Sequence, residues 1–132
     1  MALFRCGGGG DLQATTLWTN SSPTSSFSGG EVTLSQDIDN FAYIGIRFKA
    51  TTASASDLGE IIVSSADLKN ASSSGASNSR VALCANDSTA TIHVRAVSYV
   101  SDTKLNFGQG RRVNASGTSN TVAIPTSIVG YN

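Results

Sequence analysis

The sequence predicts an all-β domain, a single antiparallel β-sandwich or jelly roll of about eight strands. The 132 residues include 21 Ser, 13 Thr, 13 Gly and 9 Asn, residue types that are poor in helix interiors and common in turns. No window repeats apolar residues at i, i+3, i+4 and i+7 over three helical turns, whereas alternation with a period of two recurs along the chain. Without helices to serve as parallel crossovers, strands joined by turns favour antiparallel pairing.

The first eleven residues differ from the rest. Only Ala2, Leu3 and Phe4 lie between Met1 and Arg5, an apolar stretch too short for an export signal, and Gly7 to Gly10 cannot nucleate a helix or pack as a strand. We therefore expect residues 1–11 to form a flexible arm with a Gly hinge, and residues 12–132 to form one sandwich domain. The arm either frays or docks onto a partner chain. Its anchoring residues would be Ala2, Leu3, Phe4, Arg5 and Cys6.

The clearest strand is residues 41–49, where Ile44, Ile46 and Phe48 alternate with polar residues and should face a core. A single helical turn is compatible with residues 65–70. Pro125 cannot donate a ladder hydrogen bond, so the last strand should lie at an edge or be broken there. The other expected strands are 13–19, 31–35, 60–65, 80–86, 90–100, 103–108 and 121–131.

The segment 90–100 is ambiguous. Ile92, Val94 and Ala96 share one face, which we assign to the core, and His93 and Arg95 share the other, which we assign to solvent. The alternation blurs after Ala96, and a bulge or a second buried face would explain this. The complete expected core is Leu17, Trp18, Val32, Leu34, Ile44, Ile46, Phe48, Ile62, Val81, Leu83, Ile92, Val94, Leu105, Phe107, Val122 and Ile124.

Charge and composition exclude several classes of function. Nine Lys and Arg balance nine Asp and Glu, which argues against a nucleic-acid partner, because such proteins need a basic surface. No apolar stretch is long enough to insert into a membrane. Two Cys and one His rule out a disulfide-dense scaffold and any mechanism with two imidazoles. We expect no cofactor and no metal, and Cys84 should be a buried, inert thiol.

Two short motifs suggest ligand sites but favour simpler explanations. Asp37 and Asp39 have the spacing of calcium ligands, yet the continuation of a calcium loop is missing, so a turn with Asx hydrogen bonds is expected. Gly108 to Arg112 resembles a phosphate loop only superficially, because no helix follows it. We expect a hairpin that exposes Arg111 and Arg112 as a contact for an anionic ligand or a partner.

Catalytic and binding residues are few. No catalytic motif is present, and we expect no enzyme activity. A small carbohydrate-active enzyme, using Glu31, Glu60 or His93, is a minor alternative. Tyr43, Val97 and Tyr99 lie on nominally outward faces, and we expect them to contact a ligand or another subunit.

Several segments resemble small structural proteins of tailed phages and prophages of gut Firmicutes. They are Thr16-Leu-Trp-Thr-Asn-Ser-Ser-Pro-Thr-Ser-Ser-Phe27, Val32-Thr-Leu-Ser35, Ile38-Asp-Asn-Phe-Ala-Tyr-Ile44, Val97-Ser-Tyr-Val-Ser-Asp102 and Ala123-Ile-Pro-Thr-Ser-Ile-Val-Gly-Tyr131, besides the start of the chain. The resemblance spans nearly the whole chain and rests on the succession of strand and turn sequences rather than on a catalytic motif.

The resemblance implies a virion protein that is made in the bacterial cytoplasm and displayed on the assembled phage. We expect a tail-fibre-like or receptor-binding module anchored by its arm, and the alternative is a capsid decoration protein. The implied partners are other virion proteins, of the capsid or the tail, and a glycan on the host surface is a candidate ligand. By analogy with fibre proteins, we expect a homo-oligomer and guess a trimer.

Overall fold

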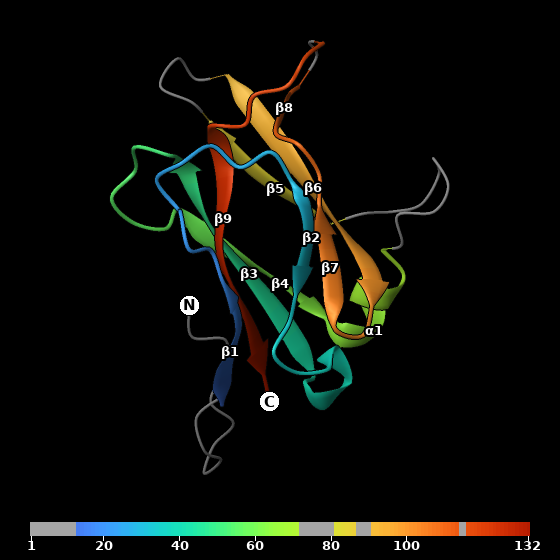
Figure 1. Ribbon diagram of the computed structural model, residues 1–132. Coiled ribbons are helices and arrows are strands. Elements are labelled where there is room, and N and C mark those ends of the chain that lie inside the picture. Colours follow the sequence, from blue (N-terminus) through green and yellow to red (C-terminus); the bar gives the residue numbers. More distant parts are fainter. Residues whose placement is uncertain (1–12, 72–80, 87–90, 114–115) are drawn as a thin grey trace, which may run out of the picture.

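The computed structural model describes residues 13–71, 81–86, 91–113 and 116–132, which form a β-sandwich of two packed antiparallel sheets (Figure 1). The predicted fold class is confirmed, and each expected strand has an observed counterpart. The expected arm lies outside the described residues. The strands are β1 (Ala14–Thr19), β2 (Gly30–Thr33), β3 (Tyr43–Thr51), β4 (Gly59–Ser64), β5 (Val81–Asn86), β6 (Ile92–Ser101), β7 (Lys104–Phe107), β8 (Arg111–Arg112) and β9 (Val122–Tyr131).

The strands divide between two sheets. Sheet A has the order β1-β9-β3-β4, and sheet B has the order β2-β7-β6-β5, with β8 also pairing with β6. Strands far apart in the sequence are therefore neighbours. In sheet A, Ile44 of β3 lies opposite both Val63 of β4 and Gly130 of β9. Because the strands are antiparallel, each sheet can bury one face against the other sheet and expose its other face to water.

The core fills the space between the two sheets. Ile44 and Ile46 of β3 and Leu105 of β7 are fully buried, as the alternation of apolar residues predicts. The rings of Trp18, Phe27 and Phe107 pack together at centroid distances of 5.6 to 6.3 Å and join the two sheets. The other expected core residues that are buried are Leu17, Val32, Leu34, Phe48, Leu83, Val122 and Ile124. Ile62, Val81 and Val94 were expected in the core but are only partly buried. Buried residues that the sequence analysis missed include Ile38, Phe41, Leu68, Ala85, Ala123 and Ile128.

Strand β6 faces the opposite way from the sequence prediction. His93 and Arg95 point inward and are 1% and 0% exposed, whereas Ile92 is 46% exposed. Val97, which we expected to be outward, is fully buried, and the expectation that it contacts a ligand or subunit is wrong in this chain. From His93 to Val97, every second residue points inward without a bulge. This is possible because the polar side chains on the inner face find hydrogen-bond partners inside the sandwich. His93 Nδ1, for example, lies 3.1 Å from the carbonyl oxygen of Thr91.

Arg95 is the reason that this inversion is tolerated. Its guanidinium donates hydrogen bonds to the carbonyl oxygens of Ala123 (2.8 Å), Gly108 (2.8 Å) and Val122 (3.2 Å). It also lies 5.1 Å from the centroid of the Phe27 ring, a cation–π distance. Burial lowers the pKa of Arg95 to about 10, so the group remains a cation at neutral pH. It thus links β6 of sheet B to β9 of sheet A.

The position of strand β9 corrects part of the prediction that the last strand lies at an edge or is broken at Pro125. The strand lies between β1 and β3 rather than at an edge. The expected break is present, because Arg47 pairs with Ser127 while Phe48 pairs with Pro125, which leaves Thr126 as an extra residue. Pairing with β1 also begins only at Ser127. Pro125 therefore sits where β9 has a ladder partner on one side only, a position that tolerates the missing N–H.

Two short helices close one end of the sandwich. The 3₁₀ turn η1 (Ile38–Asn40) begins with the Asx hydrogen bond that the sequence predicts, from the Asp39 N–H to Asp37 Oδ1 at 2.8 Å. The single-turn helix α1 (Ser65–Lys69) confirms the other expectation, and Ser64 Oγ caps it by accepting from the Asp67 N–H at 3.1 Å.

The first and last described residues lie side by side. The Gln13 N–H donates to the Asn132 carbonyl oxygen at 3.0 Å, and the Asn132 N–H donates back to Gln13 at 3.1 Å. The loops 20–29 and 52–58 lie at the other end of sheet A, where β1 and β3 end (Figure 1). The sandwich therefore has one end at which the chain enters and leaves and an opposite end built from polar loops.

Candidate functional site

A hollow in the described surface lies at the loop end of sheet A, and we call it the loop depression. Its volume is ≈ 970 Å³. It is bordered by the end of β1, the middle of β9 and the loop between β3 and β4. The lining residues are Thr19, Asn20, Pro23, Thr24, Lys49, Thr52, Ala53, Ser54, Ala55, Ser56, Asp57, Thr126 and Ser127. Side-chain hydroxyls dominate this list.

Lys49 is the positive charge of the loop depression. It belongs to β3 and alternates with the buried Phe48, so its side chain leaves the outer face of sheet A. The residue is only 6% exposed. Its ammonium donates to the carbonyl oxygens of Pro23 at 3.2 Å and Thr52 at 3.3 Å. Among the described residues, no carboxylate lies within ion-pair distance of this ammonium, so its charge is balanced only by carbonyl dipoles.

Hydrogen bonds hold the walls of the loop depression in place. Asn20 Nδ2 donates to the Pro125 carbonyl oxygen at 2.9 Å, and the Ser22 N–H donates to Asn20 Oδ1 at 2.9 Å. In the facing loop, the Thr51 N–H donates to Ser54 Oγ at 3.1 Å. These bonds come from the side chains that make Asn and Ser typical of turns. The depression is therefore preformed rather than a gap between loose loops.

Asp57 carries the negative charge at the rim. Thr126 Oγ1 donates to Asp57 Oδ1 at 2.7 Å, and both residues line the loop depression. The extra residue in β9 brings Thr126 to this position, so the strand break at Pro125 contributes directly to the site. Lys49 and Asp57 together make the hollow polar and overall neutral, with its positive charge the more deeply buried of the two.

A smaller hollow of ≈ 450 Å³ adjoins the first and shares Asp57 with it. Here Glu60 Oε2 accepts from Tyr131 OH at 2.6 Å and from Arg47 Nε at 3.4 Å. Arg47 Nη2 also donates to Tyr131 OH at 3.2 Å, and this hydrogen bond is the main cause that raises the pKa of Arg47. Burial is the main cause that raises the pKa of Tyr131. Because Glu60 already neutralises Arg47, this hollow offers less unbalanced charge than the loop depression.

The three residues of the enzyme alternative do not converge. Glu60 lies on the outer face of sheet A, Glu31 is exposed on the outer face of sheet B, and His93 is buried between the sheets. A pair of carboxylates for glycoside hydrolysis must flank one bond at about 5–10 Å, which residues on opposite faces of a sandwich do not do. The expectation that His93 faces solvent is also wrong.

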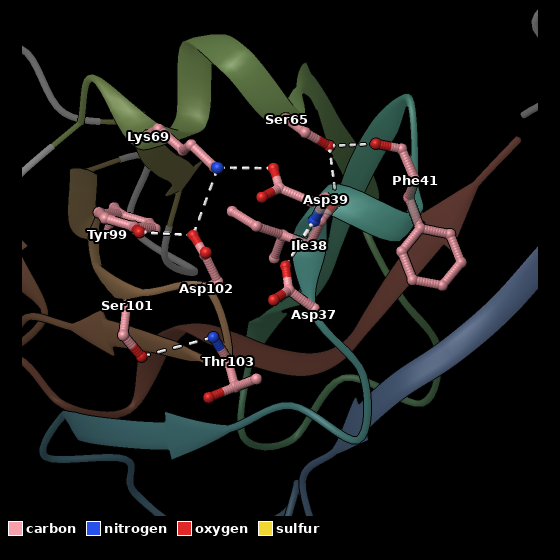
Figure 2. A network of polar contacts seen from close by, with 10 residues as sticks. All are labelled: Asp37, Ile38, Asp39, Phe41, Ser65, Lys69, Tyr99, Ser101, Asp102 and Thr103. Carbon is pink, nitrogen blue, oxygen red and sulfur yellow. Dashed lines mark hydrogen bonds and ion pairs between the residues drawn. The ribbon is translucent and has the colours of Figure 1, made fainter.

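An acidic cluster lies at the opposite end, beside α1 and η1 (Figure 2). Asp37, Asp39 and Asp102 each place a carboxylate oxygen within 4.8 Å of the others. The Lys69 ammonium lies 2.6 Å from Asp39 Oδ1 and 3.4 Å from Asp102 Oδ1, as Figure 2 shows. Tyr99 OH donates to Asp102 Oδ1 at 2.6 Å. The network therefore already contains its cation, and it ties the helical turns to the β6–β7 turn.

The protonation states follow from these contacts. The hydrogen bond to Asp39 is the main cause that raises the pKa of Lys69, and the bond to Asp102 is the main cause that raises the pKa of Tyr99. Donation by Tyr99, followed by that from Lys69, lowers the pKa of Asp102. All three pKa shifts favour a protonated Lys69, a protonated Tyr99 and an ionised Asp102. This arrangement suits a structural staple better than a metal site.

The contact residues predicted from sequence are scattered over the surface. Tyr43 is 44% exposed on sheet A, opposite Tyr131, and Tyr99 is half-buried in the acidic network. Arg111 and Arg112 are exposed on β8, and Arg111 also bridges to Thr118. None of them lines the loop depression. The anchoring residues Ala2, Leu3, Phe4, Arg5 and Cys6 lie outside the described residues.

Sequence reasoning missed the loop depression, although a signal was present. The alternation in residues 41–49 does place Lys49 on the outward face, but the proximity of Lys49 to Thr126 depends on the β3–β9 pairing. Cys84 was also misjudged, because it is exposed. It does lie on the face opposite the buried Leu83, as expected, and that face is open.

Among the residues described, the loop depression gathers hydroxyl groups, the ammonium of Lys49 and the carboxylate of Asp57. Within that part of the chain, no helix has the length and apolar character to cross a membrane. A scan against protein-family models finds no family that matches the chain, and a search of curated proteins finds no match either.

Proposed function

We propose that this protein is a structural protein of a phage virion surface, a tail-fibre-like or receptor-binding module anchored by its N-terminal arm. The observation that carries the proposal is that the two ends of the sandwich differ. The arm joins the body at Gln13, beside Asn132, whereas the loop depression lies at the opposite end of sheet A. An arm fixed to a particle would leave the loop depression facing outward.

The resemblance to small virion proteins of tailed phages supports the same function. The segments that carry it, such as Thr16 to Phe27, include the last four residues of β1 and the first wall of the loop depression. The balanced charge and the many hydroxyl side chains suit a surface that must remain soluble in many displayed copies. Under this proposal the partners are other virion proteins and a host surface component. The protein acts by binding, not by catalysis, and copies associate as a homo-oligomer.

Deleting residues 2–11 tests the anchoring step. The truncated chain should fold, because every strand pairing that the structure describes lies within residues 13–132, and its thermal midpoint should match that of the full chain. It should be absent from purified virions, since the residues proposed to dock are gone. Immunoblots of particles produced with either version measure this. As a matched control, replacing Gly7 to Gly10 by four Ser residues keeps the length and flexibility, and should preserve incorporation.

The arm would be excluded as the anchor if the truncated chain entered virions at the level of the full chain. A truncated chain that failed to fold would instead contradict the division into arm and body, and circular dichroism separates these two results.

A further inference from the structure

We propose that the loop depression binds a hydroxyl-rich ligand carrying a single negative charge, a carboxylate or a phosphate, and that Lys49 receives this charge. The inference rests on the proposed function, for which it names the class of ligand. A glycan with an acidic sugar and a polymer of polyol phosphates both present this chemistry at a bacterial surface.

The first step in the argument is the state of the Lys49 ammonium. An ammonium has three N–H donors, and the carbonyl oxygens of Pro23 and Thr52 accept two of them. One donor therefore remains for a ligand. A cation that is removed from water and lacks an ionic partner interacts strongly with an incoming anion, because solvent screens the pair only weakly. Lys49 meets both conditions among the residues described.

The second step is the chemistry of the walls. Thr24, Ser54, Ser56 and Ser127 place hydroxyl groups around the hollow. A hydroxyl both donates and accepts hydrogen bonds, as do the hydroxyls of a sugar or polyol. The methyl groups of Ala53 and Ala55 and the ring of Pro23 supply small apolar surfaces for C–H groups. The volume of ≈ 970 Å³ accommodates more than one sugar unit.

The third step concerns the number of charges. Asp57 stands at the rim with its carboxylate already bonded to Thr126. It repels a second negative charge, which limits the favoured ligand to one anionic group. Asp57→Asn keeps the hydrogen-bond acceptor for Thr126 and removes the repulsion. We therefore expect this variant to bind the anion about two- to fivefold more tightly at low salt, with the gain lost at high salt.

Titration calorimetry of the full chain with three probes tests the inference: glucuronate, the singly charged phosphodiester glycerophosphoglycerol, and glucose. At least one anionic probe should bind with a dissociation constant of about 1 mM, and glucose should bind at least about tenfold more weakly. The anion that binds identifies the source, an acidic glycan for glucuronate or a polyol phosphate for glycerophosphoglycerol. Equal binding of the neutral and anionic probes, or no binding of either anion, would overturn the proposal.

Two kinds of variant locate the binding. Lys49→Met should abolish selectivity for the anion, but it also removes two hydrogen bonds and could lower stability. Ala55→Trp leaves Lys49 intact and fills the hollow from an exposed loop position, so it should weaken anion binding about tenfold or more. Ala82→Trp, the same change at an exposed position of β5 in the other sheet, should have no effect. Equal effects of the two Trp variants would place the binding elsewhere.

These outcomes are independent of the anchoring test. A chain that is incorporated into virions but binds neither anion retains the proposed function and loses the ligand assignment. A chain that binds an anion through the loop depression but is absent from virions keeps the site and loses the proposed function.

Discussion

Replacing Arg95 by Met should lower the free energy of unfolding by ~3–5 kcal/mol, because three carbonyl groups, two of them in buried hydrogen bonds, lose their donor at once. Those carbonyls belong to Val122, Ala123 and Gly108. Met fills much of the space but donates no hydrogen bond. Ala123 also has a positive φ of 51°, a strained conformation for a residue with a side chain. Arg95 stabilises this segment by binding the carbonyls on both sides of the strained Cα.

Urea denaturation of the full chain, followed by Trp18 fluorescence, measures the effect of Arg95→Met. Arg112→Met is the matched control, because Arg112 is exposed on β8 and its loss should change stability by no more than about 0.5 kcal/mol. If Arg95→Met were as stable as the control, Arg95 would not be the link between the two sheets.

A single methyl group at position 130 should also destabilise the sandwich strongly. Gly130 faces the ring of Phe41 across the inner side of β9, and a Cβ there would lie 2.5 Å from ring carbon Cγ. Phe41 is only 7% exposed, and its carbonyl oxygen accepts a 2.6 Å hydrogen bond from Ser65 Oγ, so the ring has little freedom to retreat. We expect Gly130→Ala to cost ~2–3 kcal/mol through overpacking.

The control for this substitution is Gly59→Ala at the start of β4. An added Cβ at Gly59 meets no atom within 4 Å, so the change should be neutral or slightly stabilising, since it reduces the freedom of the unfolded chain. Urea midpoints for the two variants give the comparison. Similar midpoints would mean that the contact between Gly130 and Phe41 is looser than the structure has it.

Local pattern was sufficient to predict the strands and the fold class. In β3, strict alternation placed Ile44, Ile46 and Phe48 in the core, and the structure agrees. The Asx turn at Asp37 followed from the chemistry of its first residue, and the one-turn helix formed where the sequence allowed a single turn. Such features depend on residues adjacent in the sequence, and this is why a single sequence reveals them.

The same pattern failed where partners come from a distance. For β6, hydrophobicity alone put Ile92 inside and Arg95 outside, because the acceptors for Arg95 lie on β9 and after β7. A polar side chain can occupy a core when its hydrogen bonds are satisfied. The residues that satisfy them are distant in the sequence, so the local pattern does not reveal them. The loop depression was hidden for a related reason. Lys49 and Thr126 meet only through the β3–β9 ladder and its extra residue.

Electron microscopy of purified virions, with gold-labelled antibody against the sandwich domain, tests most directly whether the chain is displayed on a phage tail. The expected result is gold at the tail of particles that carry the full chain, and none on particles made with the chain lacking residues 2–11. Gold distributed over the head would contradict the tail-fibre-like assignment in favour of capsid decoration. Virions without any gold would contradict a role in the particle altogether.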